Sequence, residues 1–202
     1  SKYIHRHCDT MASKTKSSTT SSPSKGPIIS PITVGILVVG LSILIQFGQP
    51  PSITGPPHPN KPFSSFTQFY PFYKSEHSNE VNRQLHFAGT SLVILLFLIN
   101  LRTLPSLLFA GSIGYILSPM LAGLSHGFFE LAIVMGVFVM MNKISTGKLG
   151  VAVLIPIIGY GFAWFGHFFH EHNRPATFIY PTYSLLGDFT MWYRIATGQE
   201  SF

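Results

Sequence analysis

The feature that most constrains this chain is a series of apolar runs that are long enough to cross a bilayer. Residues 28–47 form a stretch of 20 residues without a charge, and a membrane-spanning helix needs about 20 predominantly apolar residues. Four further runs cover residues 86–100, 104–124, 127–141 and 149–169. Backbone crosses a membrane only as helices or as a closed barrel, and these runs are too long and continuous for barrel strands. We therefore predict an all-α, multi-pass transmembrane bundle with four or five spans.

The composition agrees with a membrane protein. Only 10% of the residues are charged and 46% are hydrophobic, whereas soluble domains carry about 25% charged residues. The formal net charge of +6 comes from scattered Lys and Arg without a basic stripe, so we expect no nucleic-acid partner. Because Cys8 is the single cysteine, the chain has no internal disulfide and no multi-thiolate metal site. A metal here would be held by His and carboxylate side chains.

The sequence divides into four regions: a tail (1–27), an N-terminal transmembrane segment (28–47), a Pro-rich linker (48–62) and a membrane domain (63–198). The tail is rich in Ser, Thr and Lys, so we expect it to be disordered, with a targeting peptide as the alternative. Met11 resembles a genuine start, which makes a translated leader one interpretation of residues 1–10. Residues 63–90 are rich in aromatic side chains and residues 181–198 have near-helical apolar spacing. Both patterns favour flanking interfacial helices.

Six histidines are expected near one face of this bundle. Consecutive spans with short connections return alternate helix ends to the same side. Counting spans from His86 places these histidines there: His77, His86, His126, His167, His170 and His172. His170 and His172 point to other faces of their helix than His167, so we leave them out of the candidate site. For the other four, metal binding and a wet position at the membrane surface are both open interpretations.

Two of these histidines are followed by a glutamate four residues later, His126 by Glu130 and His167 by Glu171. Residues at this spacing lie on one face of a helix, one turn apart. A carboxylate in or near hydrocarbon is costly, and it marks either function or a buried partner. Imidazole and carboxylate suit non-haem iron or zinc, and a carboxylate can instead orient a ligating imidazole. We treat Glu130 and Glu171 as candidate catalytic groups.

Two stretches of the membrane domain resemble the signature regions of a known family. They are FYPFYKSEHSNEVNRQLHFAGT (69–90) and GHFFHEHNRPATFIYPTYSLLGDFTMW (166–192). Both are similar to the 2-hydroxy-palmitic acid dioxygenase-like family of small multi-pass membrane proteins, and the resemblance covers residues 63–198. It implies an Fe(II)-dependent membrane dioxygenase of the endoplasmic reticulum. Such an enzyme uses O2 to shorten 2-hydroxy fatty acids by one carbon, in fatty acid α-oxidation and sphingoid-base breakdown.

The resemblance also implies roles for individual residues. The family's iron is ascribed to histidines. In this sequence they correspond to His77, His86 and His167, and His126 is the expected fourth ligand. In this hypothesis Arg83 or Arg174 pairs with the carboxylate of the substrate. The acyl chain then lies between the helices.

Two other classes of function stay open at this point. In a non-enzymatic membrane protein of lipid handling, the histidines would only cap helices at the interface. That interpretation predicts no bound metal and tolerance of His126→Ala. In a haem-binding bundle, paired histidines on facing helices would ligate the haem iron, and visible absorption of the purified protein would reveal it.

Overall fold

All of the secondary structure described in this computed structural model is helical. The model describes residues 29–47 and 50–202, so the tail expected at residues 1–27 lies outside the described residues, together with Cys8 and the interpretation of residues 1–10. The helices are α1 (Pro31–Phe47), α2 (Phe66–Ser75), α3 (Glu80–Ile99), α4 (Leu104–Met120), α5 (Phe128–Thr146), α6 (Gly150–Gly166) and α7 (Pro181–Ala196). Three short helices join them: η1 (Leu101–Thr103), η2 (His167–Glu171) and η3 (Ala176–Phe178).

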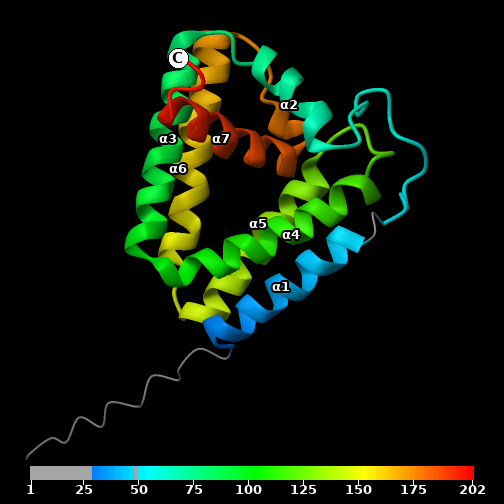
Figure 1. The fold of residues 1–202 in the computed structure, drawn as a ribbon, viewed down its shortest axis with the longest axis vertical. Coiled ribbons are helices and arrows are strands. Elements are labelled where there is room, and N and C mark those ends of the chain that lie inside the picture. Colours follow the sequence, from blue (N-terminus) through cyan, green and yellow to red (C-terminus); the bar gives the residue numbers. More distant parts are fainter. Residues whose placement is uncertain (1–28, 48–49) are drawn as a thin grey trace, which may run out of the picture.

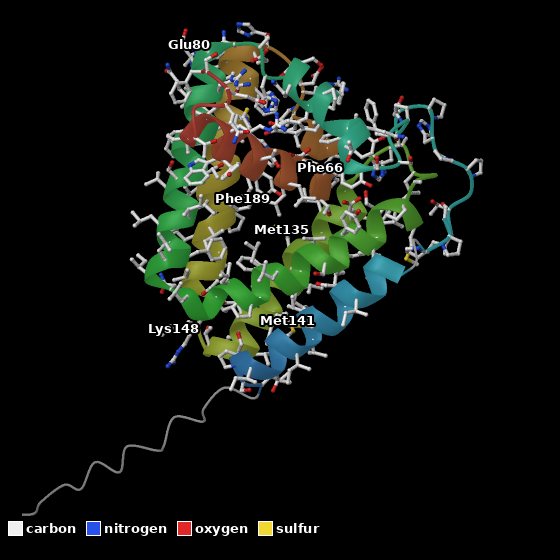
Figure 2. The ribbon with its side chains drawn as sticks, in the orientation of Figure 1. Phe66, Glu80, Met135, Met141, Lys148 and Phe189 are labelled. Carbon is white, nitrogen blue, oxygen red and sulfur yellow. The ribbon has the colours of Figure 1, made fainter. Side chains whose placement is uncertain are left out.

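Four helical stretches are long and apolar enough to cross a membrane. They are Glu80–Ile99, Leu101–Met120, Phe128–Thr146 and Gly150–Glu171, and α1 adds a shorter apolar helix. Their outer side chains include exposed Leu95, Leu98 and Ile157, which suit lipid better than water. Figure 2 places the charged residues Glu80 and Lys148 at opposite ends of the α3–α6 pair. The predicted all-α, multi-pass architecture is confirmed, and it indicates an integral membrane protein.

The span predicted for residues 86–100 begins earlier in the structure, at Glu80. The reason is the residue before it, Asn79, whose side chain accepts hydrogen bonds from the backbone N–H groups of Val81 and Asn82. A helix leaves its first N–H groups without intrahelical partners, and Asn is among the side chains that satisfy them best. The polar first turn of α3 is therefore helical, and it carries Arg83 and His86 on the same helix as the apolar residues that follow.

The helices pack as two pairs, α3 with α6 and α4 with α5, and α1 lies along α4 (Figure 1). The two pairs are inclined to each other, and α7 crosses between them, where it contacts α2, α3, α4 and α5 (Figure 1). The segment 181–198, which was predicted to be an interfacial helix, is helical over Pro181–Ala196. One of its faces is buried, with Tyr183 and Met191 almost completely covered.

The core has an aliphatic part between the spans and an aromatic part between α2 and α7. Val93, Phe138 and Ile155 belong to the first, and Phe69 and Tyr73 belong to the second. The aromatic part needs a glycine on α7, because a Cβ atom at Gly187 would lie 2.9 Å from the ring of Tyr73. This close approach brings α2 and the residues after it against α7, where the candidate site forms.

A buried three-histidine cluster as the candidate metal site

Three histidines from separate segments meet in the interior. His77 follows α2, His86 lies on α3, and His167 is the first residue after α6. One ligand atom of each lies within 4.8 Å of those of the other two, and the side chains are 1%, 4% and 2% exposed. The ring centroids are 4.5, 4.6 and 5.1 Å apart. Three buried imidazoles from separate segments thus meet in one place.

The Nδ1 atom of each ring is held by an oxygen acceptor. The three pairs are His77 with the Tyr73 carbonyl at 2.6 Å, His86 with Asp188 Oδ1 at 2.6 Å and His167 with Asn173 Oδ1 at 2.7 Å. The amide of Asn173 donates through Nδ2 to the carbonyl and carboxylate of Glu76, so its oxygen faces the imidazole. Since these partners accept, each Nδ1 carries the proton and donates it. The Nε2 lone pairs are therefore free, as in metal-ligating histidines.

The free Nε2 atoms provide a direct test of whether a metal ion fits. Those of His77 and His86 are buried and have no hydrogen-bond partner among the described residues. Leaving a buried polar atom unsatisfied costs about 1–3 kcal/mol, and here two such atoms belong to rings whose ligand atoms lie within 4.8 Å of one another. A cation would satisfy all of them together. Neutral imidazole suits iron, zinc, copper and nickel, so the residues fit a metal ion whose identity the donor set alone does not select.

The charge state of His77 agrees with a ligand role. Burial holds the pKa of His77 well below its usual value, and the neighbouring His86 and His167 lower it further. Desolvation penalises the imidazolium form, and so does a nearby positive charge. At neutral pH His77 is therefore neutral and keeps its lone pair.

His167 owes its position to an irregular turn. The helix α6 continues into the π-helical turn η2. The residue that follows this turn, His172, has the left-handed conformation, with φ 56°. There the Asn173 N–H donates back to the His167 carbonyl at 3.1 Å. A π-helical turn is rare and occurs frequently at functional sites. The wider turn brings Asn173 beside the His167 ring, and His170 and His172 lie outside the three-histidine cluster.

Asp188 is a site residue that the sequence reasoning did not select. Its Oδ1 accepts from both the Tyr73 hydroxyl and His86 Nδ1, each at 2.6 Å. Burial and the neighbouring Asp188 raise the pKa of Tyr73 well above its usual value, so its hydroxyl stays a donor. The Tyr73 ring also lies 4.1 Å from that of His77. The sequence feature that could have identified Asp188 is that it is the single acidic residue in the otherwise apolar middle of residues 181–198.

Glu171, a predicted catalytic group, binds the start of α3. Its carboxylate accepts from the Ser78 N–H at 2.8 Å, the Ser78 hydroxyl at 2.6 Å and the Asn79 N–H at 2.9 Å. Asn82 Nδ2 donates to it at 3.0 Å. These contacts tie the end of α6 to the segment between His77 and α3. Glu171 therefore acts as a positioning residue, because it holds two of the histidine-bearing segments together.

Glu130, the second predicted catalytic group, is placed at the start of α7. Its side chain is 1% exposed, and Oε1 accepts the Thr182 N–H at 3.0 Å. A carboxylate at a helix N-terminus satisfies a free N–H group and interacts favourably with the helix dipole. Buried Lys61 donates to the Leu121 carbonyl near the end of α4, and burial lowers its pKa although nearby Glu130 opposes this. The structure does not bring Glu130 to the histidine cluster.

His126, the predicted fourth ligand, is also placed away from the cluster. His126 lies just before α5. Its ring packs against two residues of the first turn of that helix, Phe128 at 5.2 Å and Phe129 at 5.8 Å. Counting spans predicts the side of the membrane on which a residue lies, but not its lateral distance from other residues. Because the two helix pairs incline to each other, with α7 between them (Figure 1), the α4–α5 connection does not meet the cluster.

The predicted substrate-binding arginines have different surroundings. Arg83 Nη2 lies 3.4 Å from the carboxylate of Glu200, near the other end of the chain. Arg174 follows η2 and is exposed. Arg83 is thus one helical turn from His86 on α3, and Arg174 lies on the surface.

The fold and the cluster define a class of protein, namely a multi-pass helical membrane protein with a buried three-histidine site that could hold a metal ion. Comparison with models of protein families finds one family, described as 2-hydroxy-palmitic acid dioxygenase Mpo1-like, which matches residues 63–132 and 124–200. The chain belongs to this family, and the resemblance predicted from residues 69–90 and 166–192 is confirmed. Neither the curated proteins nor the solved structures contain a match.

Proposed function

We propose that this protein is an Fe(II)-dependent membrane dioxygenase that shortens 2-hydroxy fatty acids by one carbon. The observation that carries the proposal is the set of three buried imidazoles whose Nδ1 atoms face oxygen acceptors and whose ligand atoms lie within 4.8 Å of one another. The description of the family supplies the reaction class and the substrate class. Iron as the metal and the endoplasmic reticulum as the location are part of the same proposal.

The reaction balances without an external reductant. A 2-hydroxy acid, R–CH(OH)–COOH, and O2 give the shorter acid R–COOH, CO2 and water. The C1–C2 bond breaks, C2 is oxidised to the new carboxyl carbon, C1 leaves as CO2, and O2 accepts four electrons. Bound iron would supply the centre that activates O2 beside the substrate.

The residues of the chain have distinct tasks in this reaction. His77, His86 and His167 hold the metal as neutral ligands. Asp188 and Tyr73 hold the His86 ring in the tautomer that leaves Nε2 free. Burial excludes water, so that the reactive centre meets substrate and O2 in a place of low polarity.

Two neighbouring apolar hollows between the helices support an acyl substrate. A groove of about 430 Å³ lies between α1, α4 and α7, within the range of about 300–1,000 Å³ that is typical of ligand pockets. The groove shares Leu107, Thr182 and Leu185 with an inner cavity of about 80 Å³. Asp188, which holds His86, lines this cavity together with Met135 of α5, and Met135 lies in the region between the helix pairs (Figure 2). An acyl chain could thus approach the site from lipid.

The test is metal analysis of detergent-purified protein together with an assay of 2-hydroxypalmitate consumption. We expect stoichiometric iron and O2-dependent formation of the C15 acid and CO2. His86→Gln and His167→Gln should lose both, whereas the controls His126→Gln and His172→Gln should keep the metal. Absence of iron after reconstitution, or full iron content in both cluster variants, would overturn the proposal. A haem absorption band in the same sample would favour the haem-binding alternative.

A further inference from the structure

Three cations converge on one carboxylate beside the histidine cluster. Glu200 lies 2.9 Å from Lys74 Nζ, 3.4 Å from Arg83 Nη2 and 3.1 Å from Arg194 Nη1. Its side chain is only 7% exposed and that of Arg83 only 15%. Three positive charges against one negative charge leave a surplus of two. A chain with so few charges therefore concentrates positive potential at one half-buried point, which we call the cation cluster (Lys74, Arg83 and Arg194).

Each member of the cation cluster is connected to the histidines, either along its helix or through aromatic rings. Arg83 precedes His86 by three residues on α3, so the two share a helix face. Lys74 is next to Tyr73, whose ring lies 4.1 Å from the ring of His77.

Arg194 joins the same group through aromatic rings. Its guanidinium carbon lies 5.1 Å above the ring of Tyr70, and Tyr70 stacks on Tyr73 at 6.0 Å. Two tyrosine rings therefore connect the charge of Arg194 to the candidate metal site.

Glu200 satisfies the cation cluster only in part. Arg83 Nε is buried and has no hydrogen-bond partner among the residues that the structure describes. The bond that Glu200 makes with Arg83 is long, at 3.4 Å to a single Nη atom. A carboxylate can bind a guanidinium through two parallel hydrogen bonds. Arg83 therefore has unused capacity for a second or better-placed carboxylate.

The segment that carries Glu200 follows the end of α7. Gly198, with φ 71°, turns the chain back at the end of α7, in the left-handed conformation that glycine adopts without strain. The N–H groups of Gln199 and Glu200 both donate to the Arg194 carbonyl, and the Phe202 ring lies 5.4 Å from Phe87. Two of the three cations that hold Glu200, Lys74 and Arg194, are 39% and 42% exposed, and an ion pair to an exposed side chain contributes only about 0–1 kcal/mol.

We propose that the cation cluster is a binding site for the carboxylate head of a fatty acid, and that Glu200 occupies this site until the ligand displaces it. The identity of the ligand rests on the proposed function, but carboxylate binding here requires neither metal nor the 2-hydroxyl group. Apparent affinity equals intrinsic affinity multiplied by the fraction of open sites, so a segment bound nine-tenths of the time weakens binding about tenfold.

The experiment measures binding of palmitate to the full chain in detergent micelles, with metal removed by a chelator. Glu200→Gln should bind palmitate about tenfold more tightly than the wild type. Arg83→Gln should bind it at least about tenfold more weakly, because a charge-assisted bidentate contact is lost. The matched control is Glu80→Gln, which removes the same charge from the exposed first residue of α3 (Figure 2) and should change the affinity less than about twofold.

Two further ligands separate the sources of the negative charge. Hexadecanol has the acyl chain without the carboxylate and should bind all variants alike. If phosphatidic acid follows the variants and palmitate does not, the site takes a phosphate head group and the fatty-acid assignment is wrong. Unchanged or weaker palmitate binding by Glu200→Gln, or no palmitate binding by any form, overturns the proposal. Glu200→Asp, which keeps the charge on a shorter side chain, should give an intermediate gain if Glu200→Gln does not fold.

The outcome is independent of the test of the proposed function. Palmitate lacks the 2-hydroxyl group and is not consumed, so its binding reports on the cation cluster alone. A protein that holds no iron could still show the predicted order of palmitate affinities, and an active iron enzyme could fail to show it.

Discussion

Asp188→Asn separates the charge of Asp188 from its shape and so tests the support of His86. The carboxylate Oδ1 accepts two hydrogen bonds of 2.6 Å, from His86 Nδ1 and from the Tyr73 hydroxyl. Asparagine has nearly the same size and keeps one oxygen, but it carries no negative charge. Tyr73→Phe is the companion variant, because it removes one donor and leaves the contact between Asp188 and His86 in place.

The magnitude follows from these two bonds. Hydrogen bonds to a charged group contribute about 1.5–3 kcal/mol each, against about 1 kcal/mol for neutral pairs. Loss of an outer partner of a ligating histidine typically lowers metal affinity about 10- to 100-fold, which corresponds to about 1.4–2.8 kcal/mol. We expect Asp188→Asn to fall in this range. Tyr73→Phe should lower the free energy of unfolding by about 1 kcal/mol and change metal affinity much less.

The assay is competition for Fe(II) between the purified protein and a chelator of known affinity, with thermal unfolding of the metal-free protein measured in parallel. The second measurement distinguishes a positioning role from a purely structural one. Wild-type metal affinity in Asp188→Asn, at any loss of thermal stability, would refute the argument that this carboxylate orients His86. An effect of Tyr73→Phe on metal affinity larger than that of Asp188→Asn would refute it too.

Three further predictions concern packing, helix capping and pH. Gly187→Ala places a methyl group 2.9 Å from the Tyr73 ring and should cost about 1–3 kcal/mol of unfolding free energy, whereas Gly136→Ala, with open space around it, should cost almost nothing in the same thermal melt. Glu130→Gln removes the negative charge from the start of α7 and should lower the unfolding free energy by about 1–2 kcal/mol, with unchanged iron content by metal analysis. Burial alone would raise the pKa of Glu200, but hydrogen bonds from two cations outweigh it and lower the pKa below its usual value of 4.5. A lowered pKa stabilises the fold above the usual value and ceases to do so as pH falls through the folded-state value. The stability difference between wild type and Glu200→Gln should therefore be constant from pH 7 to about pH 5 and vanish in more acidic buffer, and a difference that persists at pH 2 would contradict this assignment.

The membrane spans could be predicted because span length and apolarity are properties of contiguous residues. The run at 149–169 appears as the stretch Gly150–Glu171. The run at 86–100 needed correction only at its start, where Asn79 caps a polar first turn. The run at 127–141 continues to Thr146. The apolar pattern and these differences at its ends are all local in sequence.

The candidate ligands could be predicted in part. Span counting and the two family-like stretches together selected His77, His86 and His167, and the structure brings these three together. The same reasoning selected His126, which the structure places elsewhere. Counting spans orders residues along the membrane normal only. It carries no information about the inclination of one helix pair to another, which separates residues on the same side of the membrane.

The partners of these residues could not be predicted, because they come from distant parts of the chain. Asp188 lies 102 residues from His86, and Glu130 lies 52 residues from Thr182. The spacing of His126 with Glu130 and of His167 with Glu171 favoured two equivalent catalytic pairs. In the structure Glu130 accepts the Thr182 N–H and Glu171 accepts the Ser78 and Asn79 N–H groups. These contacts at the start of another helix are not encoded by spacing within one helix.

The sequence by itself indicated a helical membrane protein, the segments that are long and apolar enough to span, and a set of four histidines that contains the three of the cluster. These follow from the length of apolar runs, from the need of buried backbone for internal hydrogen bonds, and from residues grouped in two short stretches. Only the tertiary structure decided that α7 crosses between the helix pairs and brings Asp188 to His86. It also decided that Glu200 meets the cation cluster. The physical reason is that such contacts depend on how helices incline and pack side chain against side chain, which is a property of the assembled core.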